Sequence, residues 1–145
     1  MSESQNVLRP FLPFTPSPDR DSEPYWAALA QGEFKLQQCR ECAAWRWPAR
    51  AICNRCHSFE SDWRANAGRG RVESWVRTHQ AFAKALKAAV PYRVVQIRLD
   101  VQADLLLIGS WLSPREPIYQ EAVTLEIVQG LDGFHLPCWK PNNDA

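Results

Sequence analysis

Two Cys-x-x-Cys pairs constrain this sequence more than any other feature. Cys39 and Cys42 form the first pair, and Cys53 and Cys56 follow after ten intervening residues. Two such pairs separated by a short hairpin can place four thiolates around one ion in the tetrahedral geometry of structural Zn²⁺ sites. Four cysteine ligands leave no coordination position for water or substrate. The spacing therefore predicts a zinc ribbon in which these four residues hold one structural Zn²⁺.

Three other uses of the cysteines fit parts of the pattern. One pair could carry out thiol redox chemistry, but this leaves the other pair unexplained. Two disulfides would suit an oxidising compartment, whereas the N-terminus lacks the basic-then-apolar layout of a secretory signal. The run from Cys53 to His57 matches the motif of covalent c-type haem attachment. The upstream pair and the missing export signal favour zinc, with His57 as a surface residue beside the metal.

The composition and charge set broad limits on function. Hydrophobic residues make up 46% of the 145 residues, and no stretch has the apolar length that spans a bilayer, so we expect a cytoplasmic protein without membrane contact. The net charge of +1 divides into −3 for residues 1–34, +5 for residues 35–71 and −1 for residues 72–145. The positive charge lies on the predicted ribbon, where it could bind phosphates or simply face solvent.

The sequence before the cysteines divides into an arm and a helix. Residues 1–20 contain four prolines at short intervals, which excludes helix and strand pairing and predicts an extended arm. Ser22 suits an N-cap for a helix over Glu23–Gln31, and Gly32 ends it. The apolar face of this helix carries Tyr25, Trp26 and Leu29.

The sequence after the cysteines has the pattern of short strands. Five in about 70 residues predict a small Greek-key barrel of the OB type. Leu105–Leu112 is nearly continuous apolar sequence, which predicts a strand buried on both faces. Gln80–Val90 is rich in alanine and predicts a short helix or a mobile loop. The predicted strands are residues 72–79, 92–99, 105–112, 123–127 and 134–139.

These patterns combine into one expected architecture. The chain is predicted to be mainly β, with a short N-terminal helix, a four-cysteine zinc ribbon and a C-terminal five-stranded OB-fold-like barrel. The expected divisions are an arm over residues 1–20, the helix over 21–34, the ribbon over 35–66 and the barrel over 67–145.

The hairpin between the cysteine pairs carries aromatic and basic side chains. A small ribbon has little interior of its own, so Trp45 and Trp47 are not both expected to be buried within it. Tryptophan and arginine are enriched where interfaces gain most of their binding energy. We therefore expect Trp45, Arg46, Trp47 and Arg50 to pack on the neighbouring barrel or to contact a partner.

An ordered set of short motifs runs from about Asp19 to the C-terminus. Its residues are Trp26 with Leu29 and Gly32; Leu36–Cys39; Cys42; Pro48–Arg50; Cys53; Cys56; Phe59; Trp63; Gly68–Gly70; Ser74 and Trp75; Pro91 and Tyr92; and Gly109. This set resembles the DUF35 family of rubredoxin-like zinc ribbon plus OB-fold proteins. Ala43 stands where family members usually carry glycine, and Ala103–Asp104 replaces their frequent Gly-x-Arg turn.

The resemblance implies a non-catalytic accessory subunit of an acyl-CoA-processing enzyme. Family members typically accompany thiolase-superfamily proteins, including thiolases and steroid side-chain aldolases, or MaoC-like enoyl-CoA hydratases. It implies a hetero-oligomer whose partner supplies the reaction, with a coenzyme A thioester as a ligand that the two subunits share. The candidate residues for partner or coenzyme A binding are Trp45, Arg46, Trp47, Arg50, Phe82, Lys84 and Lys87.

The residues by themselves indicate no catalytic set. His79 and His135 lie on predicted strands without a nearby nucleophile and acid. Cys138 is a lone thiol that we expect to pack as a small hydrophobe, and the chain has no glycine-rich phosphate loop. The alternative from another class is a single-stranded nucleic-acid binding module, since OB barrels and ribbons both serve that use. The charge of −1 on the barrel segment counts against it.

Overall fold

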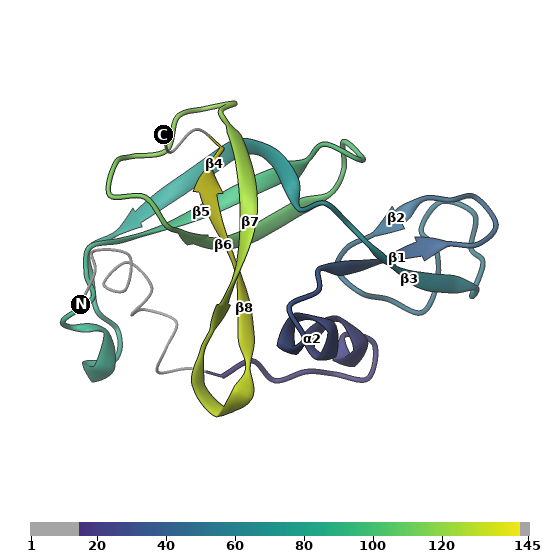
Figure 1. Ribbon diagram of the computed structural model, residues 1–145, viewed down its shortest axis with the longest axis horizontal. Helices are drawn as coiled ribbons and strands as arrows, with labels where there is room; N and C mark the ends of the chain where they lie inside the picture. Colours follow the sequence, from purple (N-terminus) through teal and green to yellow (C-terminus); the bar gives the residue numbers. More distant parts are fainter. Residues whose placement is uncertain (1–14, 143–145) are drawn as a thin grey trace.

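The computed structural model describes residues 15–142, in which one α-helix, a three-stranded ribbon and a closed barrel follow one another (Figure 1). Most of the predicted arm, including its aromatic residues Phe11 and Phe14, lies outside the described residues. Residues 15–19 belong to no helix or strand. In the described part of the chain, no helix is long and apolar enough to cross a membrane.

Helix α2 spans Glu23–Ala30, one residue shorter than predicted, and buries Tyr25 and Leu29. The predicted N-cap at Ser22 is wrong in one respect, because its side chain makes no capping hydrogen bond to the helix. The Ser22 amide instead donates to Asp19 Oδ1 at 2.8 Å, and the Asp19 amide donates to Ser22 Oγ at 3.1 Å. This reciprocal pair fixes the turn before the helix.

The ribbon is a small antiparallel sheet in the order β2-β1-β3. Strand β1 (Lys35–Cys39) is central, with the short β2 (Trp45–Arg46) on one edge and β3 (Ser61–Ala65) on the other. Leu36 of β1 is fully buried. The ribbon lies to the right of the barrel in Figure 1, with α2 below their junction.

The barrel closes in the order β4-β5-β6-β8-β7, with β7 pairing back onto β4. The β6–β8 pair is parallel and the others are antiparallel. This arrangement confirms the predicted five-stranded barrel. Its strands are β4 (Arg69–Thr78), β5 (Tyr92–Leu99), β6 (Leu106–Trp111), β7 (Ala122–Gln129) and β8 (His135–Pro141).

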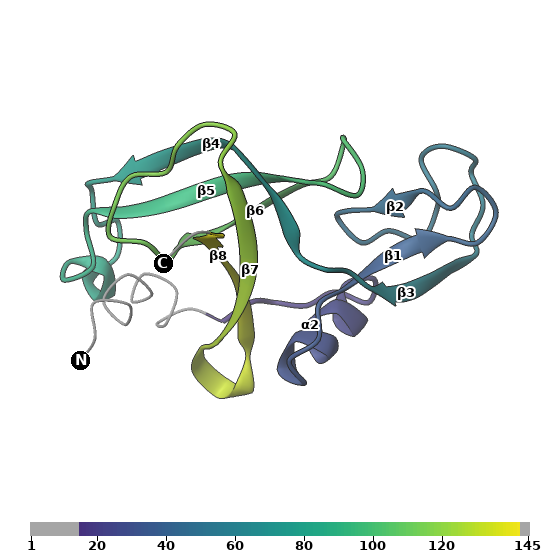
Figure 2. The same cartoon turned by 45° about the horizontal axis from the view of Figure 1, so that its top comes forward.

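The barrel interior is filled by alternate residues of β5, whereas the burial of β6 differs from its prediction. On β6, Leu107 and Trp111 are buried, whereas the side chain of Ile108 between them is 64% exposed. The expectation that this strand is buried on both faces is therefore wrong. The barrel wall is one sheet thick, and α2 covers only part of its outer surface (Figure 2). The β5 residues that fill the interior are Val95, Ile97 and Leu99.

The Gln80–Val90 connection contains a single helical turn, η1 (Lys84–Leu86). Leu86 is buried, while Phe82 is 82% exposed. Lys84 and Lys87 are exposed as well. The alternation of one buried leucine with exposed basic and aromatic residues explains why the sequence fits both a helix and a loop.

One hydrophobic core joins the helix, the ribbon and the barrel. Tyr25 and Leu29 of α2, Leu36 of the ribbon and barrel residues such as Trp139 belong to the same buried cluster. Apolar burial is the main favourable contribution to folding, so these parts stabilise one another. The predicted divisions at residues 34/35 and 66/67 stay predictions, and the core crosses both of them.

Candidate functional site

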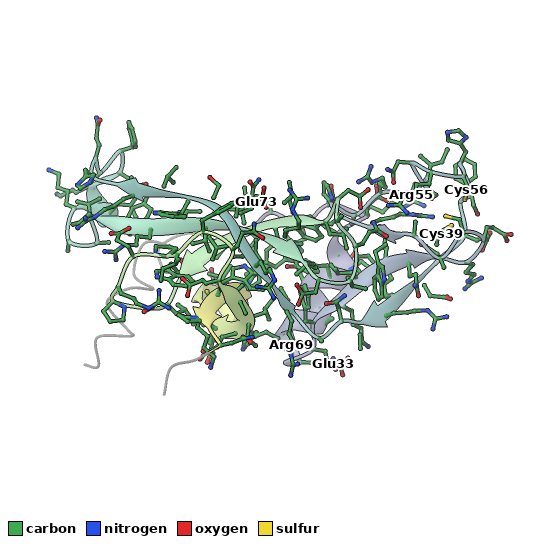
Figure 3. All side chains as sticks on the ribbon, turned by 90° about the horizontal axis from the view of Figure 1, so that it is seen from above. Glu33, Cys39, Arg55, Cys56, Arg69 and Glu73 are labelled. Carbon is green, nitrogen blue, oxygen red and sulfur yellow. The ribbon has the colours of Figure 1, made fainter. Side chains whose placement is uncertain are left out.

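The four predicted metal ligands converge at the end of the ribbon that faces away from the barrel. All four Sγ atoms lie within 4.8 Å of one another. The Cys39–Cys56 and Cys42–Cys53 sulfur distances are 3.5 and 3.6 Å. Zn–S bonds in a tetrahedral site imply sulfur–sulfur separations of about 3.8 Å, so the cluster has nearly the required dimensions. Figure 3 shows the sulfur atoms of Cys39 and Cys56 side by side at this end.

Each Cys-x-x-Cys turn ends in a residue with left-handed backbone geometry. Ala43 has φ 61° and His57 has φ 63°. The Ala43 amide donates to the Cys39 carbonyl at 3.1 Å, and the His57 amide donates to the Cys53 carbonyl at 2.9 Å. These bonds tighten both turns and aim the paired thiols at one point. Glycine adopts this conformation without steric cost, which explains the glycine that the family usually carries at position 43.

The electrostatics of the four thiols favour a cation among them. The backbone amides of Cys56 and Arg55 lower the pKa of Cys53 to about 6, and the Cys42 amide lowers the pKa of Cys39. The Ser58 amide also favours the Cys56 thiolate, yet burial and the three neighbouring thiols raise the pKa of Cys56 to about 12. Four sulfurs at this distance cannot all ionise unaided. A divalent cation removes the conflict, because it binds and stabilises thiolates.

The donor set fits a structural Zn²⁺. Zinc accepts four thiolates in a tetrahedron, and such a site has no open position for catalysis. Bound there, zinc would hold β1 to the loop before β3. Hydrophobic burial alone contributes little to this attachment. The ribbon is thus a zinc-ribbon domain with a four-cysteine site.

The prediction that Arg46 contacts a partner or coenzyme A is wrong. It is 1% exposed and lies inside the ribbon. Its guanidinium donates to the carbonyl oxygens of Arg50 (3.2 Å), Ser58 (3.3 Å) and Glu60 (3.4 Å). The side chain therefore ties together the two ends of the loop that carries the second cysteine pair. It is a structural residue in this fold and offers no surface to a ligand.

Trp45 and Trp47 are half-buried against the shared core. The rings of Trp47 and Tyr25 have their centroids 4.6 Å apart. The Arg50 guanidinium donates to the carbonyl oxygen of Trp47 at 3.0 Å and therefore lies along the hairpin. The tryptophans thus join ribbon, helix and barrel, which is the first of the two roles expected for them. Their exposed edges remain candidates for partner contact.

The other predicted contact residues lie elsewhere. Phe82, Lys84 and Lys87 belong to the η1 connection at the far end of the barrel from the ribbon (Figure 1). The structure therefore does not bring the two predicted groups into one site.

No catalytic constellation is found among residues 15–142. His135 Nδ1 lies 3.1 Å from the Gly133 carbonyl oxygen, and no described hydrogen bond links a histidine to a Ser, Cys or carboxylate side chain. Burial and the nearby Glu126 carboxylate raise the pKa of Cys138 to about 12, which keeps this thiol protonated. It packs as the small hydrophobe that the sequence predicts.

Sequence reasoning missed Gln102, which joins the barrel to the ribbon hairpin. Its side chain bonds both the amide and the carbonyl group of Trp45. No local signal could have identified this residue, because a glutamine in a polar turn is ordinary and its partner is 57 positions away.

Comparisons with known proteins agree with this architecture. A family model described as "ChsH2, rubredoxin-like zinc ribbon domain" matches residues 26–62. A solved structure described as "Ltp2-ChsH2(DUF35) aldolase" superposes with a TM-score of 0.77 at 26% identity, over 88% of this chain and 98% of that chain. The chain carries a zinc ribbon of the ChsH2 type and resembles these DUF35 proteins over most of its length.

Two further comparisons concern the fold and the length of the matching proteins. A DUF35 protein of unknown function from Sulfolobus solfataricus has the same fold, with a TM-score of 0.58 at 17% identity over 85% of this chain and 86% of that one. A "Probable enoyl-CoA hydratase alpha subunit" from Thermomonospora curvata is 26% identical over 139 residues. That match covers 96% of this chain but only 42% of the relative, so the chain spans about two fifths of that protein's length.

Proposed function

We propose that this protein is a non-catalytic accessory subunit of an acyl-CoA-processing complex, with a thiolase-superfamily protein as its partner. The observation that carries the proposal is the similarity to the ChsH2(DUF35) chain of an aldolase with Ltp2, because it covers 98% of that chain. A fold by itself does not identify a function. Here the matched structure has a described assembly, and the sequence resemblance independently implies the same class of complex.

The absence of a catalytic set in residues 15–142 supports the accessory role. A closed four-cysteine zinc site supplies no activated water. The partner would then supply the reaction, as an acyl-CoA lyase or thiolase. This subunit would stabilise the partner and help to bind the acyl-CoA.

A second candidate partner is a MaoC-like enoyl-CoA hydratase. The observation that favours it is the enoyl-CoA hydratase alpha subunit from Thermomonospora curvata, which is more than twice the length of the matched region. The additional sequence of that relative could hold a hydratase domain. Both candidates place this subunit beside an acyl-CoA enzyme, and they differ in the chemistry that follows.

A single-stranded nucleic-acid module has weaker support from the charges on the barrel. Binding to a phosphate backbone needs cations that are available to replace counterions. Five of the barrel cations instead pair with acids of the same barrel, which lowers the positive potential of its surface. These pairs are Arg77 and Arg93 with Glu116, Arg98 with Glu73, Arg115 with Glu121, and Lys140 with Glu126.

We place one candidate contact with the partner or coenzyme A at the η1 connection. Phe82 is 82% exposed there, and the basic residues Lys84 and Lys87 that follow it are exposed as well. An exposed aromatic side chain can fill a pocket on a partner, and nearby lysines can bind carboxylates or phosphates. The exposed edges of Trp45 and Trp47, with Arg50, are the second candidate contact.

The partner assignment is tested by isolating the tagged full-length chain from cells of its source organism and identifying proteins that co-purify in stoichiometric amount. A thiolase-superfamily protein is the expected result. A MaoC-like hydratase in its place would support the second candidate, whereas nucleic acid alone would overturn the proposal. The contact is tested with Phe82→Ala and Lys84→Glu/Lys87→Glu, against Phe59→Ala as a matched control. Phe59 is 73% exposed on the ribbon.

A further inference from the structure

An apolar pocket lies where the helix, the ribbon and the barrel meet. Its volume is about 230 Å³. On one side are the rings of Tyr25 and Trp26 from α2 and of Trp47 from the ribbon hairpin. The other side is the outer face of strands β6 and β8, including Ile108 and Ser110. None of the lining residues, all within the described part of the chain, carries a charge.

Two buried hydroxyl groups belong to the lining of this pocket. Tyr25 is 1% exposed and Ser110 is 2% exposed. Neither the Tyr25 hydroxyl nor Ser110 Oγ has a hydrogen-bond partner among the described residues. Buried polar groups nearly always have a partner, and leaving one unpaired costs about 1–3 kcal/mol. Two unpaired hydroxyls at one apolar pocket therefore indicate that something else supplies an acceptor.

Both hydroxyls can act as donors at neutral pH. Burial raises the pKa of the Tyr25 phenol well above its usual range, with a smaller contribution from nearby Cys138. Serine does not ionise, and Ser110 lies directly beside Cys138 on the parallel β6–β8 ladder. A carbonyl oxygen has two lone pairs and can accept from two donors at once. A carboxylate fits less well, because the uncharged lining offers no cation to pair with it.

The volume limits the size of the ligand. An engineered apolar cavity of about 150 Å³ binds benzene, whereas pockets for drug-sized ligands begin at about 300 Å³. A pocket of 230 Å³ therefore accommodates a group on the order of ten non-hydrogen atoms rather than a whole cofactor. Water suits the pocket less well, since a buried water usually makes about three hydrogen bonds and most of this lining is apolar.

We propose that this pocket is a binding site for a small, uncharged apolar group that carries one carbonyl, with the hydroxyls of Tyr25 and Ser110 donating to the carbonyl oxygen. Ketones, esters, thioesters and amides of modest size belong to this class. The inference goes beyond the accessory role and does not rest on it, because the site is formed by this chain alone.

The test uses the full chain without partner or coenzyme A. Methyl hexyl ketone is titrated into ¹⁵N-labelled protein, and amide shifts are followed by NMR. Saturable shifts are expected at Tyr25, Trp26 and Ile108–Ser110. Octanoate has the same number of carbon atoms but is charged at neutral pH, and it should bind at least about tenfold more weakly. Equal binding of ketone and octanoate, or shifts scattered over the surface, would overturn the proposal.

Conservative variants test the two hydroxyls separately from the shape of the pocket. Tyr25→Phe and Ser110→Ala should each weaken ketone binding by between about twofold and tenfold, the usual contribution of one hydrogen bond. Tyr119→Phe is the matched control, because Tyr119 is 62% exposed and lies outside the pocket. Unchanged ketone affinity in the double variant would contradict the assignment of the donors. If that variant does not fold, the ketone and octanoate comparison on the unaltered chain still decides the question.

Discussion

The side-chain amide of Gln102 pairs with the backbone of Trp45 as a neighbouring strand would. The Trp45 amide donates to Gln102 Oε1 at 2.8 Å, and Gln102 Nε2 donates to the Trp45 carbonyl at 2.9 Å. The same Nε2 donates to Asp104 Oδ1 at 2.7 Å, and Arg55 of the ribbon lies 3.2 Å from Asp104 Oδ2. The loop between β5 and β6 thus holds the ribbon edge strand β2 against the barrel.

Replacing Gln102 with alanine should loosen this junction. Both backbone groups of Trp45 lose a partner, so we expect the free energy of unfolding to fall by about 1–3 kcal/mol. The Trp45 amide should also exchange its hydrogen faster. Urea unfolding and amide hydrogen exchange measure the two effects. Gln129→Ala, at an exposed position on β7, should change neither. Equal effects of the two variants would show that the hydrogen bonds between Gln102 and Trp45 contribute nothing to stability.

Ala43, which follows the first cysteine pair, has left-handed backbone geometry. We therefore predict that glycine at this position stabilises the protein. Ala43→Gly removes a conformational cost of about 1–2 kcal/mol and adds a smaller entropic one. We therefore expect the free energy of unfolding to rise by about 0.5–1 kcal/mol. Ala65→Gly, on strand β3 without a positive φ, should lower it by a similar amount. The prediction fails if both glycines destabilise the zinc-loaded protein.

The buried guanidinium of Arg46 predicts a loss of ribbon stability that a surface arginine would not cause. Arg46→Met keeps the length of the side chain but removes three buried hydrogen bonds from a charged donor, which should cost at least about 2 kcal/mol. Arg40→Met removes only exposed ion pairs and should cost less than about 1 kcal/mol. Thermal unfolding and zinc retention against a chelator measure the difference. Similar losses in both variants would contradict the structural role of Arg46.

Glu121 predicts a pH dependence of stability with a defined sign. The pKa of its carboxyl lies below the usual 4.5, chiefly because Arg115 donates to it, with a contribution from the Ile118 amide. The folded state therefore favours the ionised form, and this stabilisation is present above pH 4.5 and lost as the pH falls below it.

Glu121→Gln should lower the free energy of unfolding by about 1–2 kcal/mol at neutral pH, and the difference should shrink below about pH 4. Glu126→Gln removes an exposed ion pair with Lys140 and serves as the control, with a loss below about 1 kcal/mol. Denaturant unfolding at several pH values gives both curves. A difference that persists unchanged into acid would assign the effect to packing.

The features that the sequence predicted correctly depend on local patterns. Cysteine spacing determines the ribbon, and the succession of short apolar strand patterns after the cysteines determines the barrel. The features that it predicted wrongly depend on how the elements pack over one another in the folded protein. Ile108 reads as buried because its neighbours are apolar, but the helix and the ribbon hairpin cover its face of the barrel only in part. Arg46 reads as a surface residue because arginine usually is one, yet the zinc hairpin folds around it.

The accessory-subunit proposal is tested most directly by reconstituting acyl-CoA turnover from purified components. Acyl-CoA cleavage is measured for this chain alone, for the co-purifying thiolase-superfamily protein alone, and for the two together. The account predicts no turnover by the chain alone and a rise in the partner's turnover or acyl-CoA affinity when the chain is added. Turnover by the chain proven free of the partner, or a partner whose kinetics and stability do not change in its presence, would contradict it.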